Sequence, residues 1–174
     1  MALRLLDRLL GRPPATPPMD ALYRAVVAIA REPRWYTAGA VPDTIDGRFD
    51  MVVATLSLVM LRLEREEAMP HALVGLTERF VEDMDGSLRE IGIGDLVISK
   101  HVGKMVGALE GRLGAYRAAF DGTEPLADAL VRNIYRGTPP SAEALTWIDS
   151  EIRQLKAAID ALPVDRLLAG ELSR

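Results

Sequence analysis

The chain has 174 residues and a formal net charge of −4 at pH 7, with 49% hydrophobic and 26% charged residues. This length corresponds to one ordinary domain, which can bury enough apolar surface to fold without disulfides or metals. The absence of cysteine excludes disulfides, iron–sulfur clusters, thiolate zinc sites and cysteine nucleophiles. The small negative charge gives no reason to expect a DNA-binding protein.

Leucine and alanine together account for 47 of the 174 residues. Both are strong helix formers, and no segment combines strand-forming residues with strict alternation over the length of a strand. The sequence therefore predicts an all-α fold. We expect a single compact helical domain of about six to seven helices over residues 19–174, joined by a proline-rich tether to an N-terminal amphipathic helix within residues 1–18.

Residues 1–12 are short, cationic and amphipathic in helical projection. Leu3, Leu6 and Leu10 fall on the apolar face, and Arg4 and Arg8 fall on the other face. Prolines then force an extended linker before residue 19. The segment is either docked on its own domain or a weak contact with a membrane surface or a partner, and both interpretations are open.

No segment of the sequence predicts export or membrane insertion. The N-terminal amphipath has neither the long apolar core nor the cleavage site of a secretory signal. The longest uncharged apolar stretch, residues 51–61, is too short to cross a bilayer. We therefore expect a soluble or peripheral protein.

Apolar residues three and four positions apart predict six helices in the domain. They span residues 19–31, 43–67, 69–84, 99–120, 126–135 and 141–162. The second of these, with its long apolar stripe, is expected to be the central element. Before it, Trp35 and Tyr36 lie in an expected loop, where the two aromatic side chains are either anchored to the core or available for binding.

Glycines at 86, 92 and 94 predict a pause between the third and fourth helices, and Ser99 is expected to cap the fourth. The acidic stretch 82–86 fails as a calcium loop, because leucine and glycine occupy the positions of the turn glycine and the bidentate glutamate. We interpret it as a helix end followed by a loop in which Asp85 and Arg89 pair. Recognition of a partner is the alternative.

One face of the fourth helix carries Gly103, Gly107, Gly111 and Gly114. Each interior glycine costs roughly 0.5–1 kcal/mol relative to alanine, so the first three forfeit about 2–3 kcal/mol of helix propensity. A compensating contact is therefore expected. The simpler explanation is close approach by another helix of the same domain, and the alternative is a groove that receives a partner's helix.

The last long helix, capped by Ser141, carries apolar residues three and four apart from Leu145 to Leu162. This narrow seam predicts packing within the domain. Pairing with a second helical protein is the alternative, and it supports the hypothesis of a general helix-pairing adaptor.

The sequence contains no recognisable catalytic template. It has no P-loop and no nucleophile elbow, and Gly92 and Gly94 lack the rest of a dinucleotide fingerprint. His71 and His101 have no partner at helical spacing, so a zinc site would need both of them together with carboxylates. We expect no catalytic residues, no metal site and no cofactor.

Two clusters of charge leave alternatives open. A small metal-dependent enzyme is one alternative, and it would use the carboxylates of Asp83, Asp85, Glu90 and Asp95. A basic surface for ribosomal RNA or anionic lipid is another, and it would use Arg112, Arg117, Arg132 and Arg136. The simpler interpretation of these arginines is solvated charge.

An ordered set of short motifs resembles the ubiquinol-cytochrome c chaperone family. The motifs are Tyr36–Thr37, VPDTIDGRFD at 41–50, FVEDMD at 80–85, LRE at 88–90, GIGD at 92–95, Gly111–Arg112, Tyr116 and Arg132–Asn133. The combination is far more specific than any one motif. The likeness spans about residues 23–135, and the last long helix lies outside it.

The resemblance implies an all-helical assembly factor of the cytochrome bc1 complex. It implies cytochrome b or another bc1 subunit as the partner, a small helical co-chaperone, and proximity to the ribosome. The arginine-rich composition and the absence of a longer presequence favour a bacterial member, placed at the cytoplasmic face of the inner membrane.

The candidate residues follow from the motifs, the glycine face and the N-terminal amphipath. Candidates for binding a partner are Tyr36, Asp43, Arg48, Asp83, Asp85, Arg89, Asp95, Gly103, Gly107, Gly111, Arg112, Tyr116 and Asn133. Candidates for contact with a membrane are Leu3, Arg4, Leu6, Arg8 and Leu10.

Overall fold

The computed structural model describes residues 19–67, 69–90 and 95–172, and it describes no side chains for 88–90 and 95–101. The N-terminal amphipath with its five candidate membrane contacts lies outside the described residues. Within them the regular elements are helices, and no strand occurs. The predicted all-α fold is confirmed.

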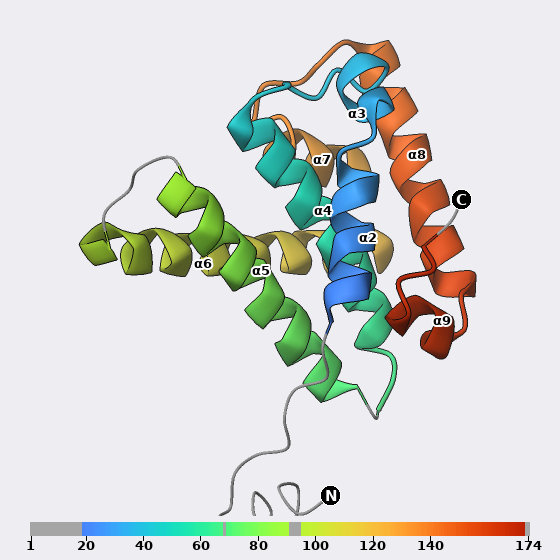
Figure 1. Cartoon of the computed structure of the whole chain (residues 1–174). Coiled ribbons are helices and arrows are strands. Elements are labelled where there is room, and N and C mark those ends of the chain that lie inside the picture. The colour runs from blue at the N-terminus through green and yellow to red at the C-terminus, as the bar shows by residue number, and fades with distance from the viewer. Residues whose placement is uncertain (1–18, 68, 91–94, 173–174) are drawn as a thin grey trace, which may run out of the picture.

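Figure 1 shows how the helices of the described ranges are arranged. They are α2 (Asp20–Ala30), α3 (Pro33–Thr37), α4 (Ile45–Leu63), α5 (Pro70–Glu90), α6 (Asp95–Phe120), α7 (Leu126–Asn133), α8 (Ala142–Ala161) and α9 (Val164–Leu168). Six of these have at least eight residues and correspond to the six predicted helices. The two five-residue helices, α3 and α9, were not predicted.

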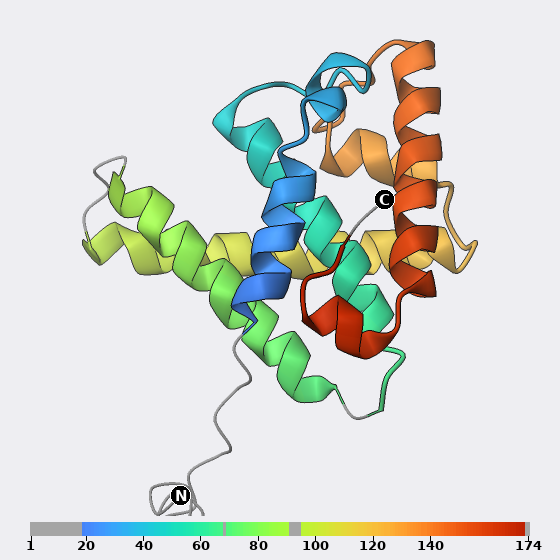
Figure 2. The ribbon, with the colours of Figure 1, turned by 45° about the vertical axis from the view of Figure 1, so that its right-hand side comes forward.

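Helix α4 is the centre of the fold. Every residue from Asp50 to Leu61 is buried, and α4 packs against α2, α5, α6 and α8. Helices α5 and α8 lie on opposite sides of it (Figures 1 and 2). A helix that is apolar on all sides needs such a complete cover, because a solvent face would leave its side chains in water.

The start of α4 is fixed by two residues. The hydroxyl of Thr44 accepts a hydrogen bond from the amide of Gly47 at 3.1 Å, which caps the helix. A Cβ on Gly47 would lie 1.9 Å from the carbonyl oxygen of Pro42. Only glycine therefore allows the preceding loop to fold so closely against this turn.

The aromatic pair ahead of α4 is anchored to the domain. Trp35 is fully buried, and its indole nitrogen donates to the carbonyl of Ile29 at 2.7 Å. The hydroxyl of the half-buried Tyr36 donates to the carbonyl of Ala30 at 2.8 Å. The expected loop is partly wrong, because Pro33 occupies the first turn of α3 and both aromatic residues belong to that helix.

Helix α8 packs inside its own domain. The hydroxyl of Ser141 accepts from the amide of Ala144 at 3.2 Å, as the predicted cap requires. Ile148, Ile152 and Ile159 are buried along its inner face, and α8 contacts α4 and α7. The seam is therefore occupied, and the structure gives no support to pairing with a second protein through it.

The boundaries of α5 and α6 differ from prediction. Helix α5 continues to Glu90, so Gly86 lies inside it and the expected loop after residue 86 is wrong, while the expected pairing of Asp85 with Arg89 falls on a side chain outside the described residues. A single interior glycine costs only about 1 kcal/mol, which a 21-residue helix with a buried face can offset. Helix α6 begins at Asp95, so Ser99 lies within the helix and is not its cap.

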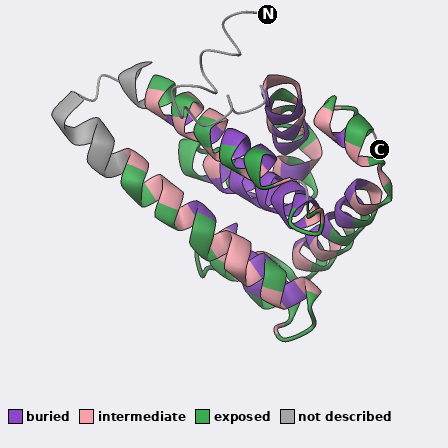
Figure 3. Ribbon diagram, turned by 90° about the horizontal axis from the view of Figure 1, so that it is seen from below, coloured by how far each residue is buried: buried purple, intermediate pink, exposed green. Residues whose placement is uncertain are grey.

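No helix in the described ranges is long and apolar enough to span a membrane. Figure 3 shows buried residues concentrated on the central helices, with exposed residues on the outer faces of the surrounding ones.

Candidate functional site

Helices α4, α5 and α6 enclose a pocket of about 880 Å³, to which the ends of α2 and α7 add side chains. Its apolar lining comes from the first half of α4 and the facing sides of α5 and α6. The apolar residues are Ile45, Phe49, Val52, Met84, Met105 and Ala108. The charged residues are Arg31, Asp46, Arg48, Asp83, Lys104, Arg112, Arg132 and Arg136, and Ser87 completes the lining.

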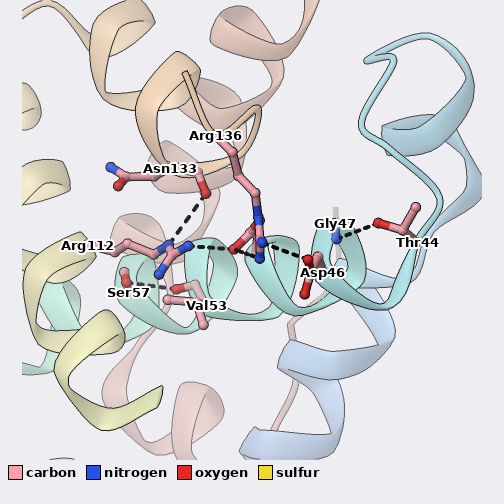
Figure 4. A network of polar contacts seen from close by, with 9 residues as sticks. Thr44, Asp46, Gly47, Val53, Ser57, Arg112, Asn133 and Arg136 are labelled. Carbon is pink, nitrogen blue, oxygen red and sulfur yellow. Dashed lines mark hydrogen bonds and ion pairs between the residues drawn. The ribbon is translucent and has the colours of Figure 1, made fainter. Parts of the chain in front are cut away.

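A buried carboxylate on α4 holds two arginines of this pocket. Asp50 is 0% exposed, and its Oδ1 accepts from Nη2 of Arg112 at 2.5 Å. Its Oδ2 accepts from Nε of Arg136 at 2.7 Å. Arg136 also donates to Asp46 at 2.7 Å. Figure 4 shows Arg112 and Arg136 reaching α4 from different elements of the fold.

The geometry of Arg136 depends on the backbone that follows α7. Arg136 has a φ of 52° and Gly137 a φ of 86°, so two successive residues adopt the left-handed conformation. For a non-glycine residue this conformation is uncommon and costs about 1 kcal/mol or more. The ion pairs with Asp50 and Asp46 offset that cost. The hydrogen bond to Asp50 also raises the pKa of Arg136 above its ordinary value.

Arg112 joins the polar and apolar parts of the pocket. Its guanidinium carbon lies 5.6 Å from the ring centroid of Phe49, in cation–π geometry. Its Nε donates to the backbone carbonyl of Asn133 at 3.4 Å. Phe49 in turn packs against Phe80, with ring centroids 6.1 Å apart. One arginine therefore contacts α4 and α7 from its position on α6.

Asp83, on the α5 side of the pocket, accepts a hydrogen bond from the hydroxyl of Tyr23 at 2.8 Å. Burial raises the pKa of Tyr23 above its ordinary value, and the hydrogen bond to Asp83 adds to that shift. The tyrosine is therefore a neutral donor at physiological pH. The contact links α2 to α5.

Two buried polar groups next to this network lack partners. The hydroxyl of Tyr116 and the side-chain nitrogen of Asn133 are buried without a hydrogen-bond partner among the described residues. Burial also raises the pKa of Tyr116 above its ordinary value. Neither residue lines the pocket, although both lie close to Arg112.

Comparison with known proteins identifies the family. A family model described as ubiquinol-cytochrome C chaperone matches residues 37–174. The chain belongs to this chaperone family. It is also similar to a crystal structure of the Cbp3 homolog from Brucella abortus, with a TM-score of 0.77 and 32% sequence identity over 99% of this chain and 96% of that one. No curated protein matches the chain.

The family match corrects one expectation. The resemblance expected from the motifs ended near residue 135, whereas the chaperone-family match continues to residue 174. Helices α8 and α9 are therefore part of the family domain. The motifs that carry the resemblance all lie before residue 135, and α8 shows only an apolar periodicity that many helices share.

The structure brings only some of the candidate residues of this chaperone-family member together. Arg48, Asp83 and Arg112 line the pocket, and Tyr116 and Asn133 lie beside it. Tyr36, Asp43 and Asp85 do not line it. Asp43 pairs with Arg48 at 2.7 Å on the exposed surface. The side chains of Arg89 and Asp95 lie outside the described residues.

No helix of the described ranges covers the glycine face of α6. A Cβ added at Gly103, Gly107, Gly111 or Gly114 would meet no atom within 4 Å among the described residues. Close approach by a helix of the same domain, the simpler explanation of these glycines, is therefore wrong for the helices of those ranges. The residues that directly follow the first three of these glycines line the pocket.

Sequence reasoning missed the residue that organises the pocket. Asp50 entered only as the last letter of a family motif, and its partners lie 62 and 86 positions away. Three of the four arginines proposed as a basic surface, Arg112, Arg132 and Arg136, do line the pocket. The fourth, Arg117, pairs with Glu64 elsewhere.

The described residues provide no metal-binding cluster for the alternative of a metal-dependent enzyme. They contain no group of three or more His, Cys, Asp or Glu side chains that could hold a metal ion. Asp83 is bonded to Tyr23 and not to a second carboxylate. Glu90 and Asp95, two of the other three carboxylates of that hypothesis, have no described side chains.

Proposed function

We propose that this chain is an assembly chaperone of the cytochrome bc1 complex. It binds cytochrome b or another bc1 subunit through a helical surface and makes or breaks no covalent bond. The support is its membership of the ubiquinol-cytochrome c chaperone family together with the pocket among α4, α5 and α6. The proposal includes action at the cytoplasmic face of a bacterial inner membrane, beside a small helical co-chaperone and the ribosome.

The observation that carries this proposal is the apolar pocket left open in an otherwise well-packed helical domain. A holder of an unassembled membrane protein needs apolar surface that its own core does not use. Phe49 and Met105, which are only partly buried against the core, supply such a surface, and the buried Met84 forms its base. Ile45, 73% exposed, extends it beyond the pocket.

Co-purification from the native host tests this function. The full chain is captured under mild detergent, and the bound proteins are identified by mass spectrometry. We expect a bc1 subunit among them, and we expect a strain lacking the chain to accumulate less assembled bc1 complex by its haem absorbance. Normal bc1 levels in that strain, with no bc1 subunit captured, would exclude the function.

The glycine face of α6 is proposed as part of the partner surface, with Gly103, Gly107 and Gly111 at its centre. Gly107→Leu places a large side chain on this open face, where no atom of the described residues lies within 4 Å of the added Cβ. We expect this variant to stay folded and to lose the bc1 subunit in the capture experiment. Gly107→Ala is the matched control, since it adds one methyl group only. Equal capture by both variants would remove the glycine face from the proposal.

The N-terminal amphipath is proposed as a membrane contact. Deleting residues 1–12 is expected to move the protein from the membrane pellet to the supernatant. An unchanged distribution would show that Leu3, Leu6, Leu10 and their neighbours do not hold the protein at the membrane.

A further inference from the structure

The pocket combines an apolar floor with an excess of positive charge. Its lining includes six cationic side chains and two carboxylates. The cations are Arg31, Arg48, Lys104, Arg112, Arg132 and Arg136, and the carboxylates are Asp46 and Asp83. A cationic rim around apolar surface is complementary to an occupant that is both apolar and acidic.

The six cations differ in how fully their charge is already neutralised. Arg112 and Arg136 share the buried Asp50, so they are committed to the fold. Arg48 pairs with Asp43 at a fully exposed site, and Arg132, 52% exposed, pairs with Glu124. Exposed pairs of this kind contribute little and exchange readily with another carboxylate.

Arg31 and Lys104 have no ion-pair partner among the described residues, and both are exposed. Arg31 ends α2, and Lys104 lies on α6, so the two approach the pocket from different helices. Tyr23 donates to Asp83 and thereby occupies one of the two carboxylates of the lining. Unpaired positive charge is therefore available to an incoming group on more than one wall.

The apolar surface of the pocket continues onto the exterior of the molecule. Ile45, on the first turn of α4, lines the pocket and is 73% exposed. Among the described residues one other large hydrophobic side chain, Val74, is exposed, and it does not line the pocket. Apolar surface that continues from a pocket onto the exterior fits a segment of polypeptide.

We propose that this pocket docks an amphipathic helix of a partner protein, with an apolar stripe that enters between α4 and α6 and with Asp or Glu side chains on its flanks. The proposal deepens the proposed function, because it states the chemistry of the segment that the chaperone holds. Carboxylates three and four residues apart flank the stripe of such a helix and reach cations on opposite walls. A cationic amphipath, such as residues 1–12 of this chain, is repelled by the same walls.

A pair of peptides tests the proposal directly. The first is an amphipathic helix of about 18 residues, since isolated helices shorter than about 12–15 residues are marginal in water. It carries leucine along one face and glutamate on both flanks. In the second peptide glutamine replaces every glutamate. We expect the full-length protein to bind the glutamate peptide more tightly by fluorescence anisotropy, with the preference lost near 1 M salt, where the Debye length is about 3 Å.

Charge reversal locates the binding site. The double variant Lys104→Glu with Arg31→Glu removes the two unpaired rim cations and is expected to weaken binding of the glutamate peptide by about tenfold. The control is Arg24→Glu with Arg153→Glu, two exposed arginines outside the pocket. It changes the net charge equally and is expected to leave binding within about twofold of wild type. Circular dichroism confirms that both variants are folded.

Equal affinity for the two peptides would overturn the proposal, and so would equal weakening by the pocket and control variants. A third contrary result is binding of vesicles rich in anionic phospholipid through Lys104 and Arg31, with no binding of either peptide. The last result would assign the cations to a membrane surface. If the pocket variant still captures a bc1 subunit from the host as wild type does, this docking site is wrong while the chaperone function stands.

Discussion

Replacing Asp50 with asparagine tests whether one buried carboxylate holds the pocket together. The substitution keeps the shape of the side chain and removes its charge. The asparagine oxygen can still accept from one arginine, Arg112 at 2.5 Å or Arg136 at 2.7 Å. The amide NH₂ then points a donor at the other guanidinium, which is itself a donor, so that hydrogen bond is lost. We expect Asp50→Asn to fold and to be less stable than wild type.

The size of the effect follows from the exposure of the two arginines. Removing one partner of a buried ion pair costs about 3–5 kcal/mol. The side chain of Arg136 is 49% exposed and keeps its contact with Asp46, so water and Asp46 recover part of the loss. The side chain of Arg112 is 15% exposed and has no other carboxylate among the described residues. We therefore expect the lower end, about 3 kcal/mol.

The assay is urea and thermal unfolding followed by circular dichroism. For a chain of this size, 1 kcal/mol shifts Tm by about 2–4 °C, so Tm is expected to fall by about 6–12 °C. Asp46→Asn is the control, because Asp46 is 68% exposed and Arg136 is its ion-pair partner among the described residues, a pair worth about 0–1 kcal/mol. A loss below about 1 kcal/mol for Asp50→Asn, or equal losses for the two variants, would refute this account of the network.

The remaining predictions concern glycines and tyrosines. A Cβ at Gly47 would lie 1.9 Å from a backbone oxygen, so Gly47→Ala is expected to lower Tm sharply in thermal melts. At Gly107 no atom of the described residues lies within 4 Å of an added Cβ, so Gly107→Ala should stabilise the fold by about 0.5–1 kcal/mol of helix propensity in urea unfolding. Tyr116→Phe removes a hydroxyl that has no partner among the described residues, so the free energy of unfolding should stay the same or rise. Tyr135→Phe loses a hydrogen bond to the backbone after α3 and should lower the free energy of unfolding by about 1 kcal/mol. A larger loss for Tyr116→Phe than for Tyr135→Phe would contradict these assignments. Burial raises the pKa of all four tyrosines, and that of Tyr135 to about 12, so the folded state retains protons that the unfolded state releases near pH 10. This stabilisation is complete below about pH 10 and declines as the pH rises toward 12, and melts in which stability does not decline from about pH 9 to 11.5 would contradict it.

The helices that sequence reasoning placed well carry their own local signals. Helix α8 follows the predicted cap Ser141, and α5 starts at Pro70, one residue after the predicted start. The apolar spacing of α4 identified it as the central element, and every residue from Asp50 to Leu61 is buried. Such signals lie within one turn or along one face of a helix, so a single sequence is enough to find them.

The errors arose where tertiary packing outweighs local preference. Gly86 predicted the end of a helix, yet α5 continues through it. Ser99 was predicted to cap the next helix, yet α6 begins four residues earlier. Helix α9 has only five residues, which is too few for a periodic pattern. Propensity is a weak signal at such positions, because the cost of one glycine or the gain of one cap is about 1 kcal/mol.

The candidate site was only partly predictable for a different reason. Family motifs identified Arg48, Asp83 and Arg112 as candidates, and all three line the pocket. The connection of Asp50 to Arg136 joins positions 86 residues apart. No local pattern in the sequence reports such a pairing. Arg31 and Lys104 were missed because an exposed cation has the same local sequence signature wherever it lies on the surface.

The burial of α4 divides the molecule into parts that can change at different rates. Every residue from Asp50 to Leu61 is buried, so a new polar side chain there would lose its contact with water and destabilise the fold. The rim cations Arg31 and Lys104 are exposed and have no ion-pair partner among the described residues, so each can be replaced without loss of an ion pair within the fold. Substitution of these cations can therefore change the charge of the pocket without altering the packing of α4. Asp50 is the exception, because a substitution there would alter the pocket and the packing of α4 together.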